Sequence, residues 1–281
     1  MSYADKVFKE TCREIIERNC SSEGFEVRAK WEDGTDAHTI KTFGVTHRYD
    51  LRKEFPAITL RNVYIKSATD EMLWIYQKKS NNINDLKSNV WNQWADENGS
   101  IRTCYGFTIG EKYLYKGMWL DQIDKVRWQL KNEPFSRRII IDMYQFKNLE
   151  TGALYPCAYS VTFNVTTTKD GKLVLNAILN QRSQDMLAAN GWNVVQYAIL
   201  LMMLAQEAGM IAGELIHVIA DCHIYDRHIP MIKELLDREE YPAPIVKLNP
   251  KVTNFYDFTT KDLIIENYKY GPQIENIPIA V

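Results

Sequence analysis

The sequence lacks the features that mark several classes of protein. Its five cysteines are scattered, odd in number and without CxxC spacing, which argues against a disulfide framework or a zinc site. The longest apolar run, 194–205, is interrupted by Gln196 and is too short to span a bilayer. There is no glycine-rich phosphate loop, and the N-terminus resembles no signal peptide. We therefore expect a cytoplasmic protein with reduced thiols, no membrane segment and no metal.

A strong excess of charge of one sign is also missing. The net charge is −2 and 25% of the 281 residues are charged. This balance gives no general attraction to nucleic acid or to an acidic membrane surface, so neither is expected as the main partner. Predicted strands and helices alternate without regular βαβ spacing, repeats or linkers. The pattern favours an α+β fold, a single domain over residues 1–281 with a large mixed β-sheet packed by helices.

Hydrophobic periodicity predicts the individual elements. Helical spacing covers 3–19, 121–131, 194–210 and 226–238, and strand-like runs cover 39–49, 139–141, 214–225 and 262–268. Ser67 and Asp70 fit a capping box before a helix at 71–76. Tyr105 and Gly106 fall in a loop-like segment.

The stretch 155–193 contains most of the readable chemistry. After Cys157 comes an alternating run through Val165, a turn at 169–172, and a second alternating run over 173–179 that leads into 181–185. Asn193 then opens the long apolar helix. Two strands joined by a turn would place Cys157 beside Arg182. A neighbouring cation lowers the pKa of a thiol and makes a thiolate nucleophile available near pH 7. The alternative is a buried cysteine that acts as a small hydrophobe.

Two further groups of polar residues each allow two interpretations. Arg137 and Arg138 are either a solvated surface pair or part of a phosphate clamp, which Arg182 and Arg28 could complete. A second group, Asp221, His223 and Tyr225, alternates along one predicted strand and so faces one side. A metal site there would lack a third ligand at useful spacing, and hydrogen bonding to a sugar hydroxyl is the other reading.

Several motifs, in order along nearly the whole chain, resemble the signatures of the folate-dependent thymidylate synthase family. They are Phe55-Pro56, Glu71 to Trp74, Trp91 to Gly99, Tyr105-Gly106, Ser136 to Ile139, Tyr155 to Cys157, Gln181 to Asp185, Gly191 to Asn193, Asp221 to Tyr225, and the terminal Ile279 to Val281. The resemblance implies reductive methylation of dUMP to dTMP, with 5,10-methylenetetrahydrofolate as co-substrate for the carbon and the hydride. Dihydrofolate would be the second product.

The resemblance also implies roles for particular residues. The catalytic positions fall on Cys157, Glu71, Tyr105, Arg182, Asp185 and Asn193. The dUMP-binding positions fall on Arg28, Arg137, Arg138, Arg182, Ser183, Asp185, Asn193, His223 and Tyr225. The folate-binding positions fall on Trp91, Trp94, Asp185, Arg61 and Val281. A homodimer is implied, formed through a sheet face, in which Arg137 and Arg138 reach the phosphate site of the partner subunit.

Asn193 indicates the base, because its amide can donate to uracil O4 and accept from N3–H. An aspartate at this position, as in related dCMP hydroxymethylases, would suit cytosine. The chain departs from the family pattern at Ala158, Ala189, Ala220 and Trp192, and at 33–39, where the usual phosphate-loop arginine is missing and Arg28 is expected to replace it. A dUMP or dCMP hydroxymethylase, and a non-catalytic nucleotide- or RNA-binding relative, remain as alternatives.

Overall fold

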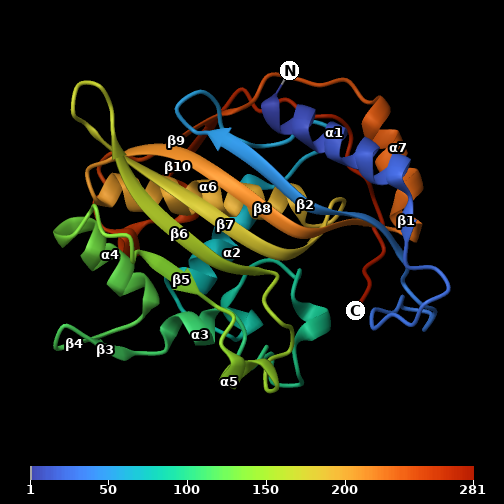
Figure 1. The fold of residues 1–281 in the computed structure, drawn as a ribbon, viewed down its shortest axis with the longest axis horizontal. Coiled ribbons are helices and arrows are strands. Elements are labelled where there is room, and N and C mark those ends of the chain that lie inside the picture. The colour runs from blue at the N-terminus through green and yellow to red at the C-terminus, as the bar shows by residue number, and fades with distance from the viewer. Residues whose placement is uncertain (1) are drawn as a thin grey trace.

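A six-stranded sheet organises the computed structural model, which describes residues 2–281. The strand order is β1-β2-β8-β7-β6-β5 (Figure 1). These strands are β1 (Cys20–Ser21), β2 (Thr39–Asp50), β8 (Ile211–Tyr225), β7 (Leu173–Asp185), β6 (Ala158–Thr167) and β5 (Ile140–Asp142). The β7–β8 pair is parallel and the other pairs are antiparallel. The sheet is therefore mixed, as predicted.

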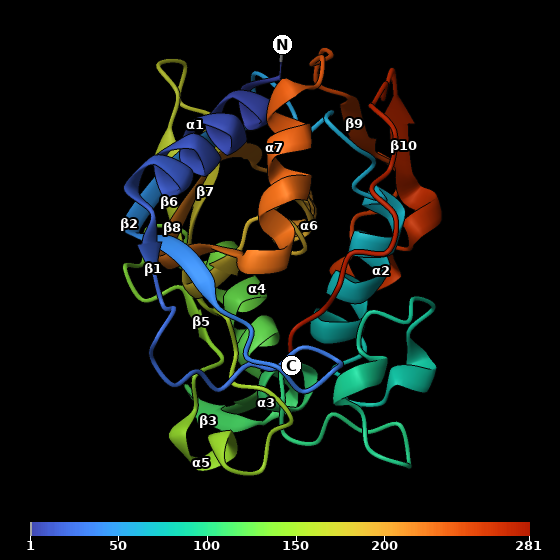
Figure 2. The same cartoon turned by 90° about the vertical axis from the view of Figure 1, so that its right-hand side faces the viewer.

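Helices cover one face of this sheet and leave the other uncovered (Figures 1 and 2). The helices are α1 (Tyr3–Arg18), α2 (Ile65–Tyr76), α3 (Gly106–Gly110), α4 (Gln122–Asn132), α5 (Phe146–Leu149), α6 (Asn190–Glu207) and α7 (Ile229–Asp237). Helix α6 packs on β7 and β8 and is covered in turn by α2, while α1 packs on β2. The nearly all-apolar sequence of α6 fits its place between two layers, because no side of it faces water.

Short elements complete the chain. They are β3 (Tyr113–Tyr115) with β4 (Met118–Leu120), β9 (Ile245–Leu248) with β10 (Leu263–Glu266), and the 3-10 turns η1 (Ile83–Asp85), η2 (Asn92–Trp94), η3 (Asp226–His228), η4 (Phe255–Asp257) and η5 (Thr260–Asp262). Among residues 2–281, no helix is long and apolar enough to cross a membrane.

The uncovered face of the sheet carries exposed apolar side chains. Ile140 of β5 and Ile178 of β7 are both paired with Thr162 of β6, so the three side chains form one row across the sheet. Ile140 and Ile178 are 42% and 41% exposed, whereas the neighbouring Ala177 and Leu179 point into the core. This apolar row lies open on the uncovered face.

The α+β class is confirmed, and most predicted elements are present within a few residues of their expected ends. The capping box at Ser67 and Asp70 is wrong. Helix α2 begins at Ile65, after Tyr64 in a left-handed conformation with φ of 53°, and Ser67 and Asp70 lie inside it. Asp70 instead accepts the backbone N–H of Lys87 at 3.1 Å. The tertiary contact therefore outweighs the local capping preference.

Three other boundaries differ from the predictions in ways that matter for the site. Strand β7 does not end near Leu179 but continues to Asp185. Helix α6 begins at Asn190, so Asn193 lies in its first turn. Gly106 starts the short helix α3 and does not lie in a loop. Pairing explains the longer strand, since Asn180 and Gln181 pair with both β6 and β8, and Ser183, Gln184 and Asp185 pair with β8.

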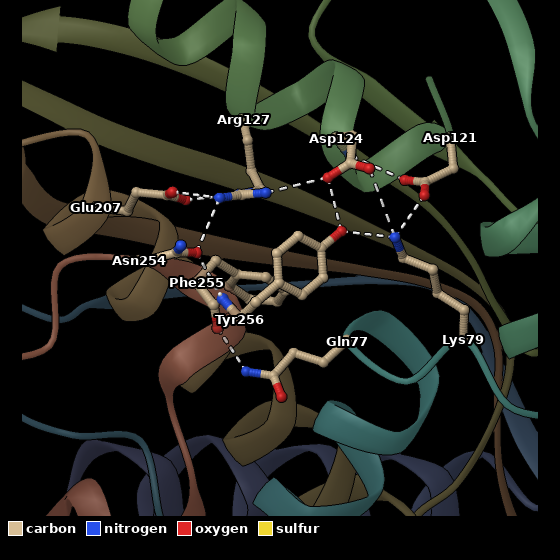
Figure 3. Close-up of polar contacts among 9 residues, drawn as sticks. All are labelled: Gln77, Lys79, Asp121, Asp124, Arg127, Glu207, Asn254, Phe255 and Tyr256. Carbon is tan, nitrogen blue, oxygen red and sulfur yellow. Dashed lines mark hydrogen bonds and ion pairs between the residues drawn. The ribbon is translucent and has the colours of Figure 1, made fainter. Parts of the chain in front are cut away.

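A network of ion pairs and hydrogen bonds joins the end of α2 to α4, α6 and η4 (Figure 3). Lys79 binds Asp121, lies 3.6 Å from Asp124 and donates to the Tyr256 hydroxyl at 2.6 Å. Arg127 holds Glu207 through two hydrogen bonds of 2.8 and 2.6 Å and reaches Asp124 at 3.0 Å. The network fixes the turn that contains Lys79 and Ser80.

Candidate active site

Cys157 and Arg182 lie side by side, as the predicted hairpin requires. Ala158 pairs with Gln181 across β6 and β7, and the backbone N–H of Arg182 donates to the Cys157 carbonyl at 2.9 Å. The Arg182 guanidinium donates to the carbonyls of Pro156 at 3.0 Å and Tyr155 at 2.6 Å, and one of its nitrogens lies 3.6 Å from Cys157 Sγ. Three contacts thus hold a fixed positive charge against the thiol.

The expected lowering of the thiol pKa is wrong. Burial raises the pKa of Cys157, and this effect outweighs the lowering by the positive charges of Arg182 and Arg28. Removing a thiolate from water costs more free energy than the two guanidinium groups return. The thiol is therefore the resting form, and the arginine reduces the cost of ionising it.

Tyr105 also contacts Cys157. Its hydroxyl oxygen accepts the backbone N–H of Cys157 at 3.0 Å. Tyr105 has a positive φ of 30°, and the next residue, Gly106, lies so close to the Ser80 turn that an added Cβ would stand 2.1 Å from the Ser80 carbonyl oxygen. Only glycine fits this approach, so the turn held by Lys79 sets where the Tyr105 ring stands.

An aromatic wall stands next to Tyr105. The ring centroid of Trp91 lies 5.4 Å from Tyr105 and 5.4 Å from Trp94, both in edge-to-face contact. Trp91 is buried at 7% exposure and Trp94 is half-buried. The half-buried ring of Trp94 keeps an exposed part that can stack against a planar heterocycle.

Glu71 is a buried carboxylate behind this wall. Its Oε2 accepts the indole N–H of Trp192 at 2.7 Å. Burial raises the pKa of Glu71, while the neighbouring side chains of Trp91, Trp192 and Gln196 act in the opposite direction. A carboxyl group with a raised pKa suits proton transfer near neutral pH. In the sequence, Trp192 stands out only as a departure from the family pattern. Its hydrogen bond to Glu71 was not predicted.

Asn193 is half-buried and held at both ends of its amide. Its Oδ1 accepts from Gln181 Nε2 at 3.1 Å, and its Nδ2 donates to Gln196 Oε1 at 3.2 Å. Sequence reasoning missed both glutamines. The available signal was the position of Gln181 on the inward face of an otherwise apolar alternating strand.

The end of β8 presents its polar group on one face, as predicted. His223 Nδ1 lies 2.8 Å from Asp221 Oδ1, and the rings of His223 and Tyr225 meet edge to face at 5.0 Å. Ser183 pairs with Asp221 across β7 and β8, so the end of β7 lies alongside this group. Lys41 binds the second oxygen of Asp221 at 2.7 Å.

Asp185, which pairs with His223 across the two strands, uses its carboxylate inside the fold. Its Oδ1 accepts the backbone N–H groups of Leu187 and Ala188 at 2.8 and 3.1 Å. The same oxygen lies 3.5 Å from His228 Nδ1. These contacts fix the turn between β7 and α6.

The segment with Arg28 and the C-terminus lie together. Lys30 and Val281 exchange two backbone hydrogen bonds of 2.9 and 3.0 Å, and Figure 2 shows the C-terminus against this loop. Arg28 is exposed, and its positive charge acts to lower the pKa of both Cys157 and Tyr225. Arg28 therefore faces the same site as these two residues.

Arg137, Arg138 and Arg61 do not join this group. Arg137 and Arg138 are exposed before β5, where Ile139 accepts from Phe163, six positions along from Cys157. At roughly 3.4 Å per strand residue, that separation is about 20 Å. Arg61 is only 9% exposed and donates to the Leu187 carbonyl at 2.5 Å. Its buried guanidinium lacks the exposure that contact with a folate tail requires.

Two surface hollows lie away from Cys157. One, of about 370 Å³, is lined by residues that include Lys79, Asp121 and Asp124. The other, of about 270 Å³, lies between α4 and the end of α6. Polar groups of the first already pair with each other in the network of Figure 3. In the part of the chain that the structure describes, no cluster of three or more His, Cys, Asp or Glu residues has metal-binding geometry.

Comparison with known proteins agrees with the site. The profile of the family described as "Thymidylate synthase" matches residues 6–281. The chain is 42% identical over 279 residues to "Thymidylate synthase 1" of Bacillus subtilis, covering 98% of each protein, and 40% identical over 279 residues to "Thymidylate synthase" of Bacillus phage phi3T. The solved structure of thermostable thymidylate synthase A from Bacillus subtilis superposes with a TM-score of 0.91 at 40% identity and 100% coverage of both chains.

These observations define an enzyme of the α+β class whose site holds a thiol between an arginine and a tyrosine. The chain belongs to the thymidylate synthase family. Its activity is that of a thymidylate synthase, a methyltransferase of dTMP biosynthesis.

Proposed function

We propose that the chain methylates dUMP with 5,10-methylenetetrahydrofolate through a covalent bond between Cys157 and C6 of the uracil ring. The observation that supports this most directly is the clamp on Cys157, in which Arg182 lies 3.6 Å from Sγ and Tyr105 holds the backbone N–H. A uracil ring is a poor carbon nucleophile at C5 until a thiolate adds to C6, so a positioned thiol is the essential group.

Arg182 has two tasks in this proposal. Its guanidinium reduces the cost of ionising Cys157, and its exposed edge faces the nucleotide phosphate together with Arg28 and Ser183. Guanidinium groups match phosphate oxygens with paired hydrogen bonds. The nucleotide phosphate would therefore bind to an Arg182 guanidinium that is already held in position. His223 and Tyr225 would bind the deoxyribose hydroxyl, and Asn193 would bind the base.

Proton transfers at the base fall to Glu71 and Tyr105. Glu71 has a raised pKa and stands behind Trp91, while the Tyr105 hydroxyl lies at Cys157. A carboxyl group of raised pKa can both give and take a proton near neutral pH. Asp185 supports the site by fixing the turn that carries α6.

The residues present fit a reduced folate. Trp91 and Trp94 offer a partly exposed aromatic wall next to Tyr105, and the C-terminal Val281 is tied by two hydrogen bonds to the loop that carries Arg28. When bound, the folate supplies the one-carbon unit and the hydride. Closure by Val281 would exclude water, which would otherwise capture the one-carbon unit and give a hydroxymethyl product.

We also propose a homodimer. Arg137 and Arg138 lie about 20 Å along the sheet from Cys157 of their own subunit. They flank the uncovered face that carries Ile140 and Ile178. Pairing of two such faces would bury the apolar row and allow both arginines to reach the phosphate site of the partner subunit.

The test is incubation with 5-fluoro-dUMP and methylenetetrahydrofolate followed by mass analysis. We expect an adduct on Cys157 and none in Cys157→Ala, which should also lose dTMP formation by about 10⁴-fold or more. Cys20→Ala, a change at an exposed cysteine, is the matched control and should form the adduct. A folded wild-type protein without adduct would refute the nucleophile. Turnover of dUMP without dihydrofolate would favour the hydroxymethylase.

A further inference from the structure

A chain of buried side chains connects β8 to the proposed base-reading residue. His217 Nε2 lies 2.5 Å from Gln181 Oε1, and Gln181 Nε2 donates to Asn193 Oδ1 at 3.1 Å. His217 and Gln181 are 0% and 2% exposed. Ala158, the cross-strand partner of Gln181, has no side-chain donor, so His217 is the group that meets Gln181 Oε1.

The amide of Gln181 has only one consistent orientation. Its Nε2 also lies 3.3 Å from the Ser183 carbonyl, which can only accept. With both N–H groups used by Ser183 and Asn193, Oε1 must face His217 and needs a donor there. A reversed amide would set two oxygen atoms against each other at Ser183.

His217 supplies that donor as its Nε2–H tautomer. Burial lowers the pKa of His217 to about 3, so the ring is neutral and carries one proton. Its Nδ1 is buried and has no partner among residues 2–281. A proton on Nδ1 would leave an unpaired N–H in the core, whereas a proton on Nε2 completes the bond to Gln181.

The consequence appears at Asn193. With Oδ1 turned to Gln181 and Nδ2 turned to Gln196, one lone pair of Oδ1 and one N–H of Nδ2 remain free. Uracil presents an N3–H donor and an O4 acceptor, which match this pair. Cytosine presents an N3 acceptor and an N4 amino donor, which would match only the reversed amide.

We propose that His217, acting through Gln181, is the positioning residue that fixes the Asn193 amide and makes the site select a uracil edge over a cytosine edge. The inference rests on the proposed role of Asn193 in dUMP binding. It adds that the selection depends on one donor, located on β8 and not on the strand that carries Gln181.

The experiment compares His217→Met with His217→Gln. The two side chains have the same length, but only glutamine carries a donor at the ε position. Dissociation constants for dUMP and dCMP, measured by calorimetry, give the discrimination ratio. We expect His217→Met to narrow the ratio by about tenfold or more, since a buried acceptor loses its partner. His217→Gln should remain within about twofold of the wild type.

His47→Met is the matched control. His47 is the cross-strand neighbour of His217 and is also buried, but its Nε2 meets Thr11 at 2.9 Å and not Gln181. It should lose stability and keep the wild-type ratio. An unchanged ratio in folded His217→Met, or equal narrowing in the Met and Gln variants, would overturn the proposal.

A second measurement uses the wild-type protein alone and is independent of whether the variants fold. Nitrogen-15 spectra of labelled histidine distinguish the two tautomers of the ring. An Nε2–H signal for His217 at neutral pH supports the proposal, and an Nδ1–H signal overturns it. Failure of the wild type to form dTMP would instead count against the proposed function, because the binding ratio does not require turnover.

Discussion

Around Lys79 the chain pairs its charges with each other, whereas around Cys157 it arranges polar groups and leaves part of their bonding capacity open. Lys79 meets two carboxylates and a hydroxyl, and Arg127 meets two carboxylates and an amide (Figure 3). Asn193, in contrast, keeps one donor and one acceptor free, and Arg28 is exposed. The first region has most of its bonding capacity used within the fold, and the second keeps capacity for a ligand.

Asp124 of the network and Cys157 of the site differ in the direction of their pKa shifts, although burial also raises the pKa of Asp121 in the network. In the network, burial acts to raise the pKa of Asp124, but the hydrogen bond from Tyr256 and the charge of Lys79 outweigh it, and the pKa is lowered. At the site, burial of Cys157 outweighs the charges of Arg182 and Arg28, and the pKa is raised. A thiol that a substrate must activate differs in this way from a carboxylate that stays ionised.

The largest expected effect comes from breaking the paired region. Lys79→Met removes the partner of Asp121, whose side chain is 2% exposed, and leaves a buried carboxylate without its cation. We expect a loss of about 3–5 kcal/mol in the free energy of unfolding. Chemical denaturation measures it. The paired Lys79→Met/Asp121→Asn variant should regain part of the loss, and a single variant as stable as the wild type would show that the network adds no stability.

The buried histidine His47 is expected to make the free energy of unfolding depend on pH. Burial lowers the pKa of His47 to about 4, while an unfolded histidine titrates near 6.5. Between these values the unfolded chain binds a proton that the folded chain does not, so stability falls as pH falls. From pH 7 to 5 this amounts to about 2 kcal/mol for His47.

Asp5 opposes this trend, because burial raises its pKa to about 6 and the folded chain then binds a proton before the unfolded one. Replacing His47 by Gln isolates one contribution. We expect the free energy of unfolding of His47→Gln to fall by about 2 kcal/mol less than that of the wild type between pH 7 and 5. Equal losses, measured by urea titration at both pH values, would contradict the assignment.

Removing a cation from the proposed phosphate site should weaken substrate binding without affecting folding. Arg28→Ala removes an exposed cation from the proposed phosphate site, and we expect KM for dUMP to rise by about tenfold or more with little change in Tm. Arg52→Ala, a change at an exposed arginine that pairs with Asp50, is the control and should keep the wild-type KM. An unchanged KM in Arg28→Ala would show that Arg28 does not replace the missing loop arginine.

The smallest effect concerns Trp192. Trp192→Phe removes the indole N–H that bonds to Glu71, so the pKa of Glu71, already raised by burial, should rise further. We expect the acid limb of the kcat profile to move to higher pH and kcat at neutral pH to fall about threefold. Trp119→Phe, at an exposed tryptophan of β4, should leave the profile in place. A profile that does not shift in Trp192→Phe would exclude a role for this bond.

Much of this arrangement could be predicted from residue order. The alternating runs on both sides of the turn at 169–172 placed Cys157 beside Arg182, and the odd-numbered positions of β8 placed Asp221, His223 and Tyr225 on one face. The homologous motifs supplied the family. The burial of Arg61 against the Leu187 carbonyl could not be predicted, because a lone basic residue in the sequence is expected to be exposed.

The sequence by itself determined the α+β class, the family and the side-by-side placement of Cys157 and Arg182, because strand alternation and local turn chemistry act over a few residues. Only the tertiary structure decided three features: the direction of the pKa shift of Cys157, the hydrogen bond from Trp192 to Glu71, and the hydrogen bonds that connect His217 to Asn193. These features depend on burial and on partners from distant segments of the chain. Desolvation and hydrogen-bond geometry arise only once the chain has folded, so the order of residues does not reveal them.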